Sequence, residues 1–257
     1  MEENPSNVIG NENRVSPRKS IGKTLAWLLI VVLGIVVLLG LLLPTHRSAS
    51  EASRRMQCLS KLRQVGLAIL IYEAQYHEFP PAYTVDENGK RLHSWRTLIL
   101  PYIGRNDLYS KIDLSKAWDD PVHDAVRREK VSIFQCPTND PLVPVGNTTY
   151  MVVVDANSCF RPGKSIALKD IIDRESETLL VCEADVTQSV PLMSPQDLDL
   201  NTVLAFSKNS KTAHPGGRQI VFVDGSGRFC SIANAPDFVR AAMTINGNDS
   251  FYKDSDE

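Results

Sequence analysis

The residues of this sequence best placed to do chemistry together are His214 and Asp224, which nine residues separate in the pattern H-x9-D-G. A histidine and a carboxylate can act as an acid–base pair or provide two ligands to a metal ion. The apolar segment 219–223 between them reads as a β-strand, which would place the two side chains about 30 Å apart at ~3.3 Å per residue. Asp224 and Gly225 both tolerate the positive φ of a tight turn. We therefore interpret His214, Asp224 and Gly225 as an architectural motif.

A second acidic pair, Glu183 and Asp185, alternates at the end of an apolar strand candidate and could offer a cation two oxygen ligands. A solvated strand end explains the pair equally well. We therefore predict that Glu183 and Asp185 lie at a solvated strand end and bind no cation. The other histidines fall in different predicted elements, at His46, His77, His93 and His123. The sequence contains no phosphate-binding loop, nucleophile elbow or zinc-protease motif. We therefore predict a protein that is not an enzyme and that has no catalytic residue, cofactor or metal ion.

Charge and cysteine content narrow the classes of function further. The net charge of −2 excludes a nucleic-acid-binding protein that relies on bulk basicity. The five cysteines form no C-x-x-C pair, which excludes the zinc and thioredoxin-type patterns. Outside the cytoplasm, five cysteines allow two disulfides and one free thiol. Alternatively, all five are small buried hydrophobic residues.

The uncharged stretch 24–43 indicates where the protein acts. As a helix it would cover about 30 Å at ~1.5 Å per residue, which matches the hydrocarbon core of a bilayer. A cleaved signal peptide is the alternative, but its apolar region usually has only ~7–15 residues. We expect a retained helix that crosses the lipid bilayer of the inner cell membrane once. Positive charges flank both ends, so the length of the downstream part, which translocates largely regardless of charge, favours a cytoplasmic N-terminus and an extracytoplasmic domain.

These considerations divide the chain into four parts: a disordered cytosolic tail at 1–23, the span at 24–43, an extracytoplasmic domain at 44–248 and an acidic tail at 249–257. The domain opens with apolar residues at helical spacing over 45–76. Short helices are predicted at 94–100, 107–111, 121–128, 168–172 and 236–244, and strands at 148–154, 178–182, 219–223 and 228–232. The pattern indicates an α+β fold in which the long N-terminal helix packs on an antiparallel sheet. Segment 219–223 is apolar on both faces, which predicts a central strand covered twice.

This order of elements resembles that of type IV pilins and of type II secretion pseudopilins. Several phrases resemble more closely a pilin-like bacterial family, domain-of-unknown-function family 1559, whose members often carry an H-x9-D-G pattern near their end. The phrases are EASRRMQCLSKLRQVGLAI (51–69), FPPAY (79–83), SWRTLILPYI (94–103), LYSKIDLSKAWDDPVH (108–123) and FQCPTND (134–140). The resemblance covers about residues 22–245 and implies a pilin-like fold. At the prepilin processing site, Lys23 and Trp27 replace the family's usual phenylalanine and glutamate, so we expect residues 24–43 to be retained.

Two cysteines lie inside these family-like phrases, Cys58 in MQC and Cys136 in QCPT. We expect them to form a disulfide between the long helix and the loops before the sheet, which requires Cα atoms within ~7 Å. The resemblance implies protein–protein contact in a secretion or surface assembly as the function. The alternative is an extracytoplasmic solute-binding module with a pocket near Trp95, Trp118 and the hairpin. The other interpretation of Trp95 and Trp118 is that they are core anchors under the loops and do not contact a ligand.

Overall fold

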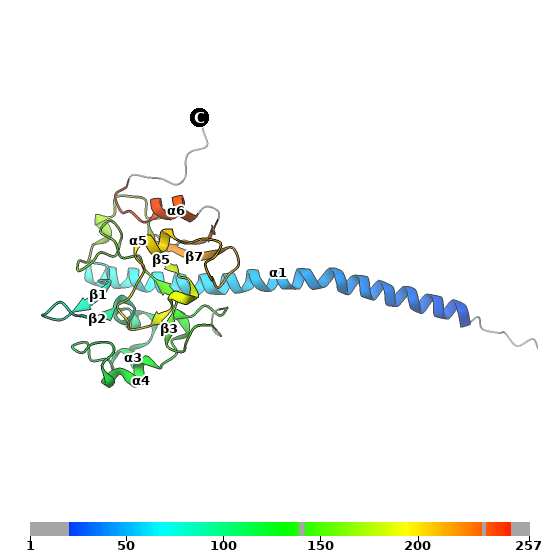
Figure 1. Cartoon of the computed structure of the whole chain (residues 1–257), viewed down its shortest axis with the longest axis horizontal. Helices are drawn as coiled ribbons and strands as arrows, with labels where there is room; N and C mark the ends of the chain where they lie inside the picture. The colour runs from blue at the N-terminus through cyan, green and yellow to red at the C-terminus, as the bar shows by residue number, and fades with distance from the viewer. Residues whose placement is uncertain (1–20, 139–141, 233–234, 248–257) are drawn as a thin grey trace, which may run out of the picture. The chain divides into compact units, whose positions relative to one another are not determined.

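The computed structural model describes residues 21–138, 142–232 and 235–247. The chain divides into two compact units, Met1–Ala49 and Ser50–Glu257, and helix α1 (Ile21–Tyr76) contributes to both (Figure 1). In the first unit, the large apolar side chains of residues 25–39 are exposed. No helix within the described residues is long and apolar enough to cross a membrane. The span expected over 24–43 lies partly outside the residues whose side chains are described, as do nearly all of the two expected tails.

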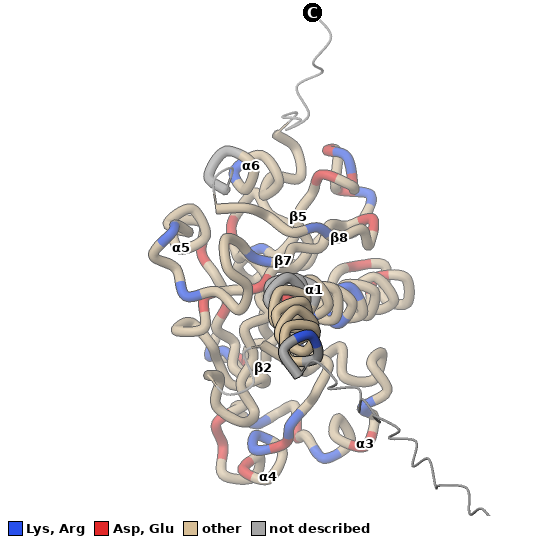
Figure 2. Tube along the Cα trace, turned by 90° about the vertical axis from the view of Figure 1, so that its right-hand side faces the viewer, with Lys and Arg blue, Asp and Glu red and all other residues tan. Residues whose placement is uncertain are grey.

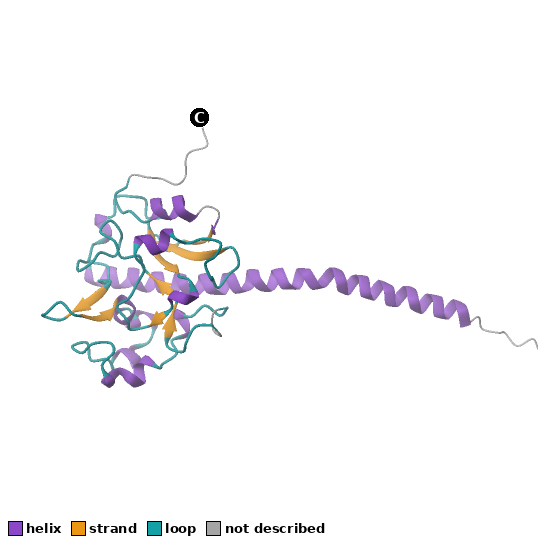
Figure 3. Cartoon of the chain, viewed as in Figure 1, coloured by secondary structure: helices purple, strands orange, loops and turns teal. Residues whose placement is uncertain are grey.

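The second unit is α+β, as predicted (Figure 3). Its main sheet is antiparallel throughout and has the strand order β4 (Tyr150–Met151), β5 (Leu179–Glu183), β7 (Gly217–Phe222) and β8 (Gly227–Ser231). Two smaller antiparallel pairs join β1 (Tyr83–Val85) to β2 (Arg91–Ser94) and β3 (Asn147–Thr148) to β6 (Val190–Pro191). The helices after α1 are short: α2 (Trp95–Leu98), α3 (Asn106–Tyr109), α4 (Asp124–Arg127), α5 (Leu200–Leu204), α6 (Ala235–Ala242) and 3₁₀ turns η1 (Leu100–Ile103), η2 (Pro121–His123), η3 (Ser132–Phe134), η4 (Leu168–Asp170) and η5 (Val186–Gln188).

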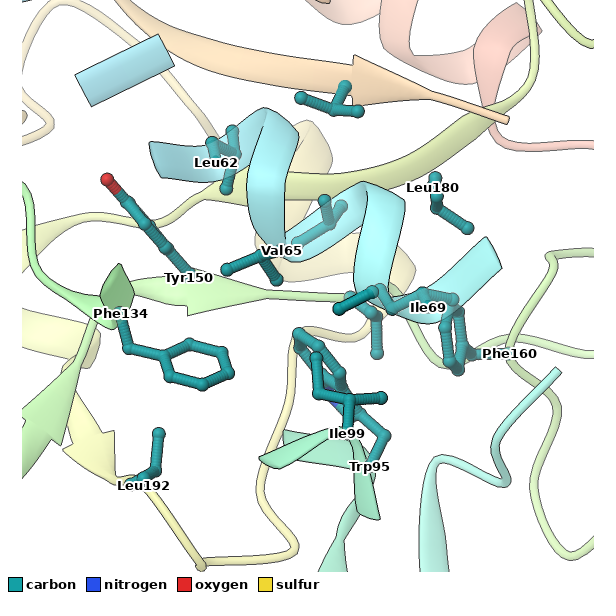
Figure 4. Close-up of a cluster of buried hydrophobic side chains, with 14 of the residues drawn as sticks. Leu62, Val65, Ile69, Trp95, Ile99, Phe134, Tyr150, Phe160, Leu180 and Leu192 are labelled. Carbon is teal, nitrogen blue, oxygen red and sulfur yellow. The ribbon is translucent and has the colours of Figure 1, made fainter. Parts of the chain in front are cut away.

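Four layers are stacked in the second unit. Figures 1 and 2 show α5 and α6 on one side of the main sheet and α1 on the other, with a loop-rich layer that contains α3 and α4 beyond α1. Within this unit α1 is therefore enclosed on two sides. Apolar residues at helical spacing fill the resulting core, and Leu62, Val65 and Ile69 have no exposed surface (Figure 4). The helix approaches β7 closely at Gly66, where a Cβ atom would lie only 2.8 Å from Cγ1 of Val221.

Strand β7 carries the packing on both faces of the sheet. Val221, and Val223 just after the strand, belong to the core that α1 shares, whereas Ile220 and Phe222 belong to a second core under α5 and α6. This alternation confirms the prediction of a central strand covered twice. Fully burying each such side chain contributes roughly 1.5–3 kcal/mol, so the strand is held from both directions.

The β7–β8 hairpin is also confirmed, with Gln219 opposite Phe229. Its turn depends on Gly225, whose φ of 77° lies in the left-handed region. The Gly225 amide donates to the carbonyl of Phe222 at 3.0 Å, and the Ser226 amide donates to the Asp224 carboxylate at 2.8 Å. Asp224 and Gly225 thus have the turn-forming positions expected of them.

Side chains cap the starts of two of these short helices. The Ser94 hydroxyl accepts a hydrogen bond from the Arg96 amide at 3.1 Å, and the Asp120 carboxylate accepts one from the Val122 amide at 3.0 Å. The β1–β2 hairpin and α5 were not predicted. Strands of three and four residues are too short to produce a readable alternation.

A buried ion pair fastens α2 to the segment before α5. The Arg96 guanidinium lies 3.0 Å from the Asp197 carboxylate, and both side chains are at most 1% exposed. Trp95 and the Val152 amide also donate to Asp197, at 3.2 and 3.1 Å. Burial raises the pKa of Asp197 to about 6, although Arg96 opposes the shift. Trp95 is fully buried beside Phe134, so it is a core anchor.

Candidate functional site

Four side chains that could bind a metal converge in the interior of the second unit. They come from α1, from the loop after η3, from the end of β5 and from the loop before β7, and they are Cys58, Cys136, Glu183 and His214. One donor atom from each residue lies within 4.8 Å of all the others. We call this set the four-donor cluster.

The surrounding structure fixes the two cysteines. Cys58 lies on the buried face of α1, four residues before Leu62. The loop that carries Cys136 is held against the same helix by Lys61, whose ammonium group donates to the carbonyls of Ser132 at 2.9 Å and Gln135 at 3.0 Å. Because one lysine clamps this loop to α1, the two sulfur atoms are brought close together.

His214 is oriented through both of its ring nitrogens. Nε2 lies 3.4 Å from Sγ of Cys136, and Nδ1 lies 2.9 Å from Oε1 of Glu51. Glu51 is an acceptor that two arginines hold in place, Arg54 at 3.0 Å and Arg55 at 3.2 Å. A proton on Nδ1 therefore leaves Nε2 as the nitrogen that faces the cluster. Burial lowers the pKa of His214, but hydrogen bonds to Cys136 and Glu51 outweigh burial, so the net shift is upward.

Glu183 and Tyr150 complete the surroundings of Cys58. The Cys58 thiol donates to Oε1 of Glu183 at 3.4 Å, and its sulfur lies 3.2 Å from the Tyr150 hydroxyl. Burial raises the pKa of Glu183 to about 8. The hydrogen bond with Cys58 and the contact with His214 lower the pKa of the Cys136 thiol, whereas that of Cys58 is raised.

The cluster is sealed from solvent. Cys58, Glu183 and His214 are 0% exposed, and Cys136 is 1% exposed. A sealed set of donors is typical of structural metal sites, since catalytic sites keep one position open to substrate.

Three kinds of chemistry use some of these residues. Cys136, His214 and Glu51 stand in the order of a nucleophile, a base and an orienting carboxylate. Cys58 and Cys136 could be oxidised to a disulfide, and all four cluster residues could coordinate one metal ion. The burial of Cys136 argues against its use as a nucleophile, because a thiol that is 1% exposed cannot meet a substrate without opening of the fold.

Several expectations need correction. The structure has no Cys58–Cys136 disulfide, and all five cysteines are free and buried. The sulfur atoms of the two cysteines nevertheless lie within 4.8 Å of each other. Glu183 is not a solvated strand end: the strand runs under α1, and its last residue is fully buried. Asp185 does not join it, since it accepts hydrogen bonds from Thr187 at the start of η5.

The H-x9-D-G residues do not form one site. His214 precedes β7 and belongs to the four-donor cluster, whereas Asp224 and Gly225 follow β7 and make the hairpin turn. A pocket was expected near Trp95, Trp118 and the hairpin, and two hollows on the described surface can be compared with it. These hollows, of about 530 and 650 Å³, are lined by neither tryptophan, although the hairpin turn borders the smaller one.

Sequence reasoning missed the cluster because its members are far apart along the chain. Cys136 and His214 are 78 residues apart, and Cys58 and Glu183 are 125 residues apart. Metal motifs are recognised by short spacings, which this site lacks. One usable signal was present: Glu183 ends an otherwise apolar strand, LLVCE, in which a buried carboxylate would need a partner.

Comparison with known proteins adds a family likeness. Residues 47–156 match a family described as "Protein of unknown function (DUF1559)". The matched segment includes Cys58 and Cys136 and ends before Glu183 and His214. It supports the resemblance found in the sequence phrases over this part of the chain. No curated protein and no solved structure gives a significant match.

Proposed function

We propose that this chain is a single-pass membrane protein whose domain acts by protein–protein contact rather than by catalysis, within a pilin-like secretion or surface assembly. One observation carries the non-catalytic part of the proposal. The side chains of the four-donor cluster, which are the best equipped for chemistry among the described residues, are 0–1% exposed. Because no substrate reaches these four side chains, we assign them a role in stabilising the fold. The function is then carried out by the surface of the domain.

Membrane attachment rests on the uncharged residues 24–43 and on the exposed apolar side chains of 25–39. Fifteen consecutive residues of this character are stable in lipid but costly in water. The proposed orientation places the N-terminus in the cytoplasm and the domain outside. The partner is expected to be a protein and not a nucleic acid, since Figure 2 shows acidic and basic residues interspersed over the second unit.

Attachment is tested by extracting cell membranes with alkaline carbonate. The full-length chain is expected to stay in the pellet, and a variant that lacks residues 24–43 is expected to leave it. Mass spectrometry of the mature N-terminus distinguishes a retained span from a cleaved signal peptide. Full release of the intact chain by carbonate would contradict the proposal.

Contact is tested by cross-linking in intact cells, with the chain lacking residues 24–43 as the matched control. We expect discrete adducts with the same protein partners in repeated experiments, and their loss from the control. In parallel, the native full-length protein is treated with a thiol alkylating reagent in the presence of a chelator. Slow reaction at all five cysteines is expected, and rapid alkylation confined to Cys136 would instead favour a nucleophilic enzyme.

A further inference from the structure

We propose that Cys58, Cys136, Glu183 and His214 together bind one Zn²⁺ ion, which fixes α1 to the rest of the domain. This inference goes beyond the contact function proposed above and does not depend on it. A domain that binds zinc could act by protein–protein contact or have any other activity. An experiment that refutes the zinc site therefore leaves the proposed contact function untouched, and the reverse also holds.

The chemistry of the four donors selects the ion. Two cysteine sulfurs, one imidazole nitrogen and one carboxylate oxygen are the ligand types that zinc uses in proteins. Magnesium and calcium prefer sites made of oxygen atoms alone. Thiolates instead favour zinc and other thiophilic metals.

The distances agree with tetrahedral coordination. Zinc–ligand bonds of about 2.0–2.3 Å at tetrahedral angles place neighbouring donor atoms roughly 3.3–3.8 Å apart. Sγ of Cys58 lies 3.4 Å from Oε1 of Glu183, and Sγ of Cys136 lies 3.4 Å from Nε2 of His214. The remaining donor pairs lie within 4.8 Å. Small side-chain adjustments therefore close the site without moving the backbone.

The outer contacts are those of a metal-bound histidine. A histidine that coordinates a metal through one nitrogen commonly donates its other N–H group to a carboxylate. Nδ1 of His214 does so to Glu51 at 2.9 Å, which directs Nε2 at the cluster. The carbonyl of Pro215, the next residue, accepts a hydrogen bond from Arg55 at 2.7 Å, so α1 also holds the backbone beside the ligand.

Of the three kinds of chemistry considered for the cluster, metal binding is the one that uses all four residues. A disulfide would use Cys58 and Cys136 and leave Glu183 and His214 unexplained. A nucleophilic triad would use Cys136 and His214 and leave the other two. Because the four donors belong to separate segments and are sealed from solvent, the ion would be structural and would cross-link α1 to β5 and to two loops.

The test uses the untagged full-length protein, purified in mild detergent without chelators. Elemental analysis is expected to find one zinc per chain. Replacement by Co²⁺ should give the absorption bands of a tetrahedral ion together with thiolate-to-cobalt charge transfer, a readout that needs no variant. Addition of a strong chelator should lower the melting temperature by on the order of 10 °C.

The variants Cys136→Ser and Glu183→Gln are compared with Cys182→Ser, which alters a buried cysteine outside the cluster. We expect zinc to be lost or bound at least tenfold more weakly in the first two and retained in the control. The mild Glu183→Gln change keeps the shape of the side chain, so the comparison holds if Cys136→Ser fails to fold. A metal-free parent protein, a Cys58–Cys136 disulfide in mass spectra, equal zinc affinity in all variants, or stoichiometric binding of another metal would overturn the proposal.

Discussion

His214 Nδ1 lies 2.9 Å from Oε1 of Glu51, and this contact ties the loop before β7 to α1. It links the cluster to a partly buried carboxylate that Arg54 and Arg55 also hold. Glu51 is not one of the four proposed metal ligands. Replacing it therefore tests whether the orientation of His214 matters while all four ligands stay in place.

Glu51→Ala should therefore weaken zinc binding about 10–100-fold without changing the stoichiometry, as is typical for outer partners of metal-bound histidines. Competition with a chromophoric chelator measures the affinity. Glu78→Ala, at an exposed site beyond the end of α1, is the matched control. Unchanged affinity in Glu51→Ala would show that the carboxylate does not position the ring.

Gly66→Ala tests the contact between α1 and β7. Alanine favours a helix over glycine by ~1 kcal/mol, but overpacking of a core costs ~1–3 kcal/mol. The new Cβ would lie 2.8 Å from Val221, a stiff and fully buried side chain, so a net loss of stability is expected. In a Val221→Ala background the same change should become neutral or stabilising. Thermal melting of the four proteins measures this coupling, and a stabilising Gly66→Ala in the parent would refute the close approach.

The hairpin turn predicts a graded response at Gly225. Its φ of 77° suits glycine and is tolerated by asparagine, but it is strained for a β-branched residue. Gly225→Val should cost about 1–3 kcal/mol and Gly225→Asn distinctly less. The added Cβ itself meets nothing closer than Leu70 at 4.0 Å, so the difference between variants reports on backbone strain. Equal melting temperatures for both variants would mean that the turn does not need positive φ.

The Arg96–Asp197 pair predicts a pH dependence away from the cluster. The pKa of Asp197 is raised to about 6 in the folded state against an ordinary 3.8, so between these values the folded chain binds a proton that the unfolded chain releases. The contribution of this group to stability is complete below about 3.8 and is lost as the pH rises to 6. Relative to Asp197→Asn, the parent should gain up to about 3 kcal/mol on acidification across this window.

Denaturant unfolding of both proteins between pH 4 and pH 7 measures that difference. Other titrating groups cancel in the comparison, and the unpaired Arg96 of the variant adds only a constant offset. A parent protein that loses stability relative to Asp197→Asn on acidification would reverse the sign and show that the ion pair outweighs the burial of its charges.

Local patterns predicted much of the fold and almost none of the cluster. The alternation of Val221 and Phe222 marked a two-faced strand because each neighbour contributes to a different core. Asp224 and Gly225 marked the turn because few residues tolerate its φ. Both signals lie within a few residues of the structure they specify.

The four-donor cluster carries no such local signal, since it exists only after distant segments have met. Glu183 shows the difficulty: the end of a strand is usually solvated, and only the placement of α1 and its neighbours buries this one. The proximity of Cys58 and Cys136 was anticipated from family-like phrases, but their chemistry depends on Glu183 and His214, which no phrase connected to them.

The position of α1 also constrains how the protein is made. The helix is synthesised before the other described elements, yet its buried face around Val65 packs against β7, which leaves the ribosome roughly 150 residues later. At ~5–20 residues per second, that interval lasts on the order of 10–30 s. Throughout it, the face of α1 that packs against β7 lacks Val221 and Val223, and the thiol of Cys58 lacks His214 as a neighbour. Completion of this domain is therefore a late event in its synthesis, and a chain that ends before β7 would lack the central strand that packs against its first helix.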